Sequence, residues 1–192
     1  MRAGIRSSAS LSFMSISSPK IEIKETVGLD SSEVKNIYCE AWDNHYWLVM
    51  EYIYSIVVSL SFSGGRAKSS DVAEDYHTLC QNYQDLSFNE ELYFCYLNHN
   101  KIMTKMIKLI VKKKPIIEYY SQWQETVVQI ATLYQQKYEK LQQERLVNLL
   151  KAYNLDLLNE IYNIVNDALN HDQKLNTYIT IKTIADYINS TF

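Results

Sequence analysis

Helix-breaking residues are scarce in this chain. Its 192 residues include only four glycines and two prolines, so few positions impose a turn or interrupt a helix. Apolar residues make up 47% of the chain and charged residues 21%, a balance typical of globular and not of disordered proteins. A chain of this length forms one domain, or one domain with a tail. The composition therefore predicts an all-α protein, an irregular bundle of five to six helices.

Catalytic signatures are also missing. The chain contains no Gly-rich phosphate-binding loop and no GxSxG, HExxH or CxxC motif, and its four histidines are scattered. Its three cysteines cannot all pair within the chain, which argues against a disulfide-stapled secreted scaffold. A net charge of −3 provides no general attraction to nucleic acid. We therefore expect a non-enzymatic protein without a cofactor, whose partners are other protein subunits.

Helix boundaries follow from capping residues and from the few breakers. Polar residues that can cap a helix, followed three residues later by Glu, mark the starts, while glycine and proline mark the ends. We expect starts at Asp30, Ser70 and Ser87 and stops at Gly64 and Pro115. The second and third helices would form a hairpin that turns near Ser87. One long helix is predicted over about 116–151, and two shorter helices would follow it.

The first residues of the chain have a composition of their own. Arg2 and Arg6 are the only charges in residues 1–18, and seven of these residues are serine. An acid-free, amphipathic segment with Arg and Ser is typical of a mitochondrial transit peptide, although a disordered terminus explains it equally simply. We therefore divide the chain into a flexible segment 1–29 and a single helical domain 30–192. The expected location is mitochondrial, and otherwise cytoplasmic.

Residues 46–62 form the most apolar stretch, with Glu51 as their single charge. Seventeen residues are marginally long enough to span a bilayer, so the stretch predicts either membrane contact or the buried central helix of a bundle. Small residues recur every four positions in it and just beyond it, a spacing that lets helices approach closely. These residues are Ser55, Ser59 and Ser63.

Histidine and cysteine are paired twice at helical spacing. His77 and Cys80 share one helix face, and so do Cys95 and His99. If these helices form a hairpin, the four side chains would converge and suit a tetrahedral zinc ion that closes it. The same geometry allows a disulfide between the two cysteines. The alternative is that both cysteines are small core residues.

A row of lysines lies along the predicted third helix. Lys101, Lys105, Lys108 and Lys112 recur along one face, and two further lysines extend the row to Pro115. Such a face can meet anionic lipid, an acidic partner or RNA phosphates, or it can simply be solvated. Because aromatic residues do not interleave with these lysines, base stacking is not indicated.

One weak family resemblance is visible. Residues 50–54, MEYIY, resemble the first helix of the poxviral Bcl-2-like immune modulators, and residues 128–169 have a helix rhythm similar to their C-terminal half. Residues 63–120 do not follow this pattern, and no functional residue is carried over. The resemblance implies a helical binding module of viral or host origin, with a peptide groove.

The amino-acid sequence therefore supports three functional hypotheses. The first is a helical assembly subunit, an accessory component of a mitochondrial membrane complex. The second is the Bcl-2-like binding module, and the third is an adaptor with a zinc-stabilised helical hairpin.

Overall fold

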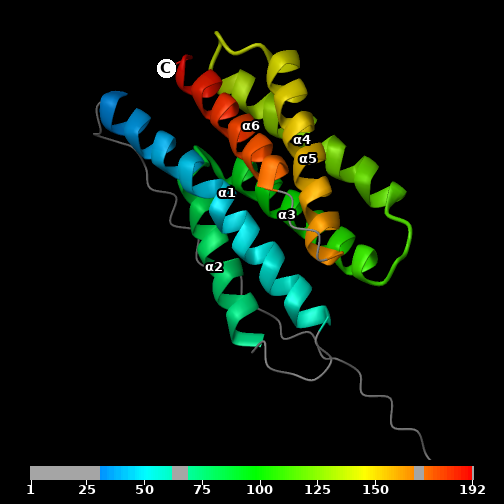
Figure 1. Ribbon diagram of the computed structural model, residues 1–192. Helices are drawn as coiled ribbons and strands as arrows, with labels where there is room; N and C mark the ends of the chain where they lie inside the picture. The colour runs from blue at the N-terminus through cyan, green and yellow to red at the C-terminus, as the bar shows by residue number, and fades with distance from the viewer. Residues whose placement is uncertain (1–30, 62–68, 167–170, 192) are drawn as a thin grey trace, which may run out of the picture.

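The computed structural model describes residues 31–61, 69–166 and 171–191. Within these ranges the chain is helical apart from short turns, and it contains no strand there. Six helices pack as a bundle (Figure 1). They are α1 (Ser31–Ser61), α2 (Ser69–Asp85), α3 (Glu90–Val111), α4 (Ile117–Lys137), α5 (Gln143–Val165) and α6 (His171–Asn189). The predicted all-α bundle of five to six helices is confirmed.

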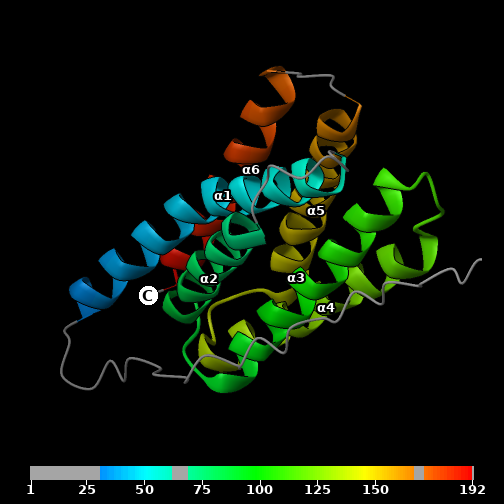
Figure 2. The ribbon, with the colours of Figure 1, turned by 90° about the horizontal axis from the view of Figure 1, so that it is seen from below.

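α1 is the central helix, and it contacts α2, α3, α5 and α6. Figures 1 and 2 show α2 and α6 lying beside it. Its buried side chains recur every three or four residues and form a broad apolar face; they include Trp42, Tyr46, Val49, Ile53 and Ile56. Much of the apolar stretch that begins at Tyr46 therefore packs into the core. In the described part of the chain, no helix has the length and apolar character needed to cross a bilayer.

The single long helix predicted over about 116–151 is wrong. α4 ends at Lys137, and α5 begins only at Gln143. In the intervening turn Leu141 is buried, and the backbone N–H of Gln142 donates a hydrogen bond of 2.7 Å to the hydroxyl of Tyr187. The turn lets α4 and α5 pack against each other and bury both of their apolar stripes. That burial outweighs the helical preference of the polar residues between them, because tertiary packing supplies most of a helix's stability.

The predicted hairpin of α2 and α3 exists only near its turn. There the rings of Tyr83 and Tyr96 stack with their centroids 5.2 Å apart, whereas α2 packs mainly along α1 and α3 along α4. The capping residue of α3 also differs from the prediction. Asn89 accepts a hydrogen bond from the N–H of Leu92 at 2.8 Å, while the hydroxyl of Ser87 donates to the carbonyl of Tyr83. Ser87 therefore closes the end of α2, and Asn89 opens α3.

α3 ends before Pro115, as predicted. Lys113 has a left-handed backbone with a φ of 53°. Its N–H donates to the carbonyl of Ile110, and the N–H of Lys114 donates to that of Leu109, both at 2.9 Å. This is the Schellman pattern, in which glycine usually occupies the position of Lys113. Pro115 then disfavours helical backbone at the residue before it, so the chain turns into α4.

Candidate interaction surface

An aromatic group is exposed where α1 meets α6. We define the α1–α6 aromatic surface as Trp47 and Tyr54 of α1 with Tyr178 of α6. Trp47 is 59% exposed, although its ring centroid lies 4.9 Å from that of Tyr46 and 6.0 Å from that of Tyr178. Because neighbouring rings support it, the large indole is held on the surface and does not collapse into the core.

The outward stripe of α1 explains how the sequence produces this surface. Exposed residues recur every three or four positions along it, the spacing that keeps them on one helical face; they are Glu40, Asn44, Trp47, Glu51 and Tyr54. The stripe alternates acidic or amide side chains with aromatic ones. α1 is therefore apolar towards the core and mixed towards solvent.

Three contacts set how α6 lies on α1. Asp43 forms an ion pair with Lys182, Tyr46 packs on Tyr178, and Cys39 accepts a hydrogen bond of 2.8 Å from the side chain of Asn189. Residue numbers rise on one helix as they fall on the other, so the two helices run antiparallel. The ion pair is partly exposed and contributes less than about 1 kcal/mol. Its main effect is to orient the helix that carries Tyr178.

A buried carboxylate lies beneath this surface. The hydroxyl of Tyr46 donates to both carboxylate oxygens of Glu160 on α5, at 3.3 and 3.4 Å. Burial raises the pKa of Glu160, while hydrogen bonds from Thr177 and Tyr46 oppose that rise. Residues of α1, α5 and α6 therefore meet at one polar contact inside an apolar core. Such contacts favour one helix arrangement over others because an unpaired buried carboxylate is costly.

Two histidines make hydrogen bonds within the bundle, one of them buried and the other partly buried. The ring of His45 is buried, and its Nδ1 lies 2.8 Å from Oδ1 of Asn82 on α2. Burial lowers the pKa of His45 to about 4. His99 of α3 stacks on Trp123 of α4, and burial lowers its pKa to about 3. Both rings are therefore neutral near pH 7, and each hydrogen-bonds to a side chain of a neighbouring helix.

The structure does not gather the four residues proposed for zinc. His77 is exposed on α2, and Cys80 is buried beside Tyr76 and Tyr93. Cys95 and His99 instead face α4, where Nδ1 of His99 lies 2.7 Å from Oγ1 of Thr126. Among the described residues, no three His, Cys, Asp or Glu side chains cluster as metal ligands would. The spacing argument assumed that α2 and α3 face each other along their length, but their main packing partners are α1 and α4.

The cysteines are free thiols in this arrangement. Burial raises the pKa of Cys80, and burial together with the charge of Glu91 raises that of Cys95. A raised pKa keeps a thiol protonated and weakly nucleophilic near neutral pH. Neither cysteine therefore has the environment of an activated nucleophile.

The serine ridge and the lysine row lie at separate places. Ser55 is partly buried and hydrogen-bonds to Asp75 of α2, Ser59 is exposed, and Ser63 lies outside the described residues. The ridge thus contributes one polar contact between α1 and α2. Three of the row's lysines are exposed and the fourth is partly buried; the exposed ones are Lys101, Lys105 and Lys112, and the fourth is Lys108.

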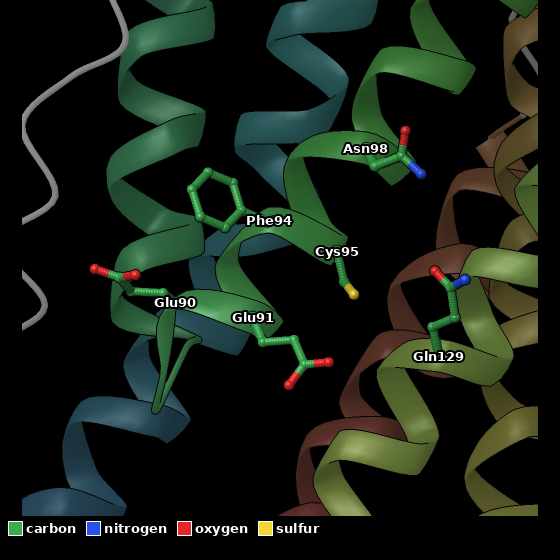
Figure 3. A pocket seen from close by; sticks show the side chains of 6 residues that line it. All are labelled: Glu90, Glu91, Phe94, Cys95, Asn98 and Gln129. Carbon is green, nitrogen blue, oxygen red and sulfur yellow. The ribbon is translucent and has the colours of Figure 1, made fainter.

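A depression of about 520 Å³ lies between the first half of α3 and α4. Figure 3 shows its lining residues. The side chains of Glu90 and Phe94 point to one side, away from Cys95 and Gln129. These groups do not converge on a common point, as the reacting groups of a catalytic site must. The depression therefore offers a contact area along α3 and α4.

Trp47 is the residue that sequence reasoning passed over, because the stretch around it was treated as uniformly apolar. The polar residues Glu40, Asn44 and Glu51 on its helical face would have marked it as solvent-facing.

Comparisons of the chain with protein-family models, curated proteins and solved structures gave no match.

Proposed function

We propose that this protein is a helical interaction subunit that binds a partner protein through the α1–α6 aromatic surface. The observation that carries the proposal is Trp47, 59% exposed yet supported by Tyr46 and Tyr178. Tryptophan and tyrosine are enriched among the few residues that dominate binding energy at protein interfaces. A pre-positioned indole also loses little conformational freedom when a partner covers it.

The charges around Trp47 indicate the chemistry of the partner. Glu40 and Glu51 are exposed on the same stripe of α1, about two turns before Trp47 and about one turn after it. Opposite charges across an interface raise association rates and select against wrong partners. The partner surface should therefore combine an apolar pocket for the indole with flanking lysine or arginine residues.

Affinity isolation of the full chain from its native cells, with quantitative mass spectrometry, tests this proposal. Trp47→Ala should reduce recovery of the partner by about 30-fold or more, the loss expected when a central aromatic is truncated. Leu155→Ala is the matched control, because Leu155 is 49% exposed on α5. Equal recovery with wild type and Trp47→Ala would exclude this surface.

Within this role, we place the protein as an accessory component of a mitochondrial complex. The support is the acid-free segment of residues 1–18, which contains Arg2 and Arg6. Residues 1–30 fused to a fluorescent reporter should direct it to mitochondria. A diffuse cytosolic signal would remove the mitochondrial location and leave the interaction surface untouched.

A further inference from the structure

The turn between α3 and α4 concentrates positive charge. Six of the residues in 101–114 are lysine, and no acidic residue occurs from 92 to 117. Three of the lysines are consecutive and exposed at the turn, Lys112, Lys113 and Lys114. The turn lies at an edge of the molecule in both ribbon views (Figures 1 and 2). In a chain of net charge −3, this edge is therefore a local basic region.

An apolar side chain stands beside these lysines. Ile117, the first residue of α4, is 79% exposed, the largest fraction among the exposed large apolar residues of the described chain. Its neighbour Ile116 packs against the core, so the two consecutive isoleucines point to different environments. We define the α3–α4 tip as Lys112, Lys113, Lys114 and Ile117.

The backbone holds the α3–α4 tip in a defined shape. The two hydrogen bonds that close α3 hold the backbone of Lys113 and Lys114 on its last turn, and both helices are anchored by buried residues such as Ile110 and Trp123. Lys113 adopts a left-handed backbone that a glycine would adopt more easily. The chain therefore has a positively charged lysine at a position where the left-handed backbone favours glycine.

We propose that the α3–α4 tip docks on the surface of an anionic phospholipid bilayer. The three lysines meet the lipid phosphates, and Ile117 enters the boundary between headgroups and acyl chains. Basic residues combined with an exposed apolar side chain are the features that bind such interfaces. Nucleic acid fits less well, because single-stranded nucleic acids stack on aromatic side chains and the exposed apolar group here is aliphatic. This site belongs to α3 and α4, so it is separate from the α1–α6 aromatic surface.

Flotation of the purified full chain with vesicles tests the role of charge. The protein should float with vesicles of phosphatidylcholine mixed with phosphatidylserine, and not with phosphatidylcholine alone. Replacing the three tip lysines by glutamine should weaken binding by about 100-fold, from the attraction expected for each surface cation. The matched control replaces three exposed lysines elsewhere, Lys137, Lys140 and Lys151, and should bind nearly as wild type.

The apolar contact needs its own test. Ile117→Ser should weaken vesicle binding by about tenfold, while Leu155→Ser should not change it. In an Ile117→Trp variant, the added fluorescence should shift to the blue and be quenched by brominated lipid, whereas a Leu155→Trp variant should show neither effect. Binding that ignores the charge of the lipid, or that depends on the lysines but not on Ile117, would overturn the proposal. The second outcome would indicate a purely electrostatic partner such as RNA or an acidic protein.

Discussion

His45 should make the folded state sensitive to acid. The side-chain amide of Asn82 donates to the carbonyl of Ala41 at 2.8 Å, which directs its oxygen at the histidine. Nδ1 of His45 therefore carries the proton of the neutral ring, and this N–H donates a hydrogen bond to Oδ1 of Asn82. The ring packs edge-on against Trp42 and beside Tyr83, so a second proton would place a charge among buried aromatic groups.

The magnitude follows from the displaced pKa. The unfolded chain protonates His45 near pH 6.5, whereas burial lowers the folded-state pKa to about 4. Between these values the unfolded state binds more protons, so the free energy of unfolding falls as the pH falls. Since one pKa unit corresponds to about 1.4 kcal/mol, His45 alone should remove about 3 kcal/mol by about pH 4. That loss is a substantial part of the free energy of unfolding of a typical domain, about 5–15 kcal/mol.

Urea unfolding followed by far-UV circular dichroism, from about pH 7 to about pH 4, measures this loss. His45→Gln should be less stable than wild type at neutral pH, because the smaller side chain fills the aromatic site poorly, but its stability should fall less steeply with acid. The remaining slope should include the contribution of His99, whose pKa is lowered to about 3. His77 is exposed on α2, so His77→Gln is the matched control for the same substitution made outside the core. Equal slopes for wild type and His45→Gln would refute the assignment.

Three further changes test other parts of the fold. Burial raises the pKa of Glu160, so its carboxyl group favours folding below about pH 4.5 and loses that contribution as the pH rises through the folded-state pKa. Glu160→Gln should therefore unfold at a higher urea concentration than wild type at pH 7. A lower midpoint would contradict this. In thermal unfolding, Lys113→Gly should stabilise the protein by about 0.5–1 kcal/mol, because glycine adopts the left-handed backbone without strain. Lys112→Gly is the control and should destabilise the protein, because Lys112 has a φ of −86°. Leu141→Ala should cost about 2–5 kcal/mol in denaturant unfolding because its side chain fills the core under the α4–α5 turn, and a loss under about 1 kcal/mol would mean that this turn is not anchored there.

Helix boundaries with local causes were predictable from the sequence. The first helix was expected to start at Asp30 and stop at Gly64; both residues lie outside the described ranges, and α1 spans Ser31–Ser61 between them. α3 ends before Pro115 as expected. Capping residues and proline act within a single turn of helix, so the information is contained in a few neighbouring residues. Even the misplaced cap of α3 lies only two residues from its true position, because serine and asparagine compete for the same role.

The break between α4 and α5 has no such local cause. No glycine or proline occurs in residues 138–142, and the turn depends on the burial of Leu141 and on a hydrogen bond to Tyr187, which is distant in sequence. The four residues proposed as zinc ligands do not come together in the described structure, and the reason is related. Spacing identified the helix faces that carry Cys95 and His99, but only tertiary packing decides that these faces turn towards α4.

The same separation of faces makes the proposed surface testable apart from folding. Tyr46 and Trp47 are consecutive on α1, yet Tyr46 is buried against Glu160 whereas Trp47 is 59% exposed. Removing the indole deletes mainly solvent-facing area, so Trp47→Ala should bind its partner poorly while remaining folded. Removing the phenol ring of Tyr46 would instead leave a cavity beside a buried carboxylate and destabilise the whole bundle. A loss of partner binding at Trp47 with an unchanged unfolding midpoint would therefore assign the effect to the surface itself.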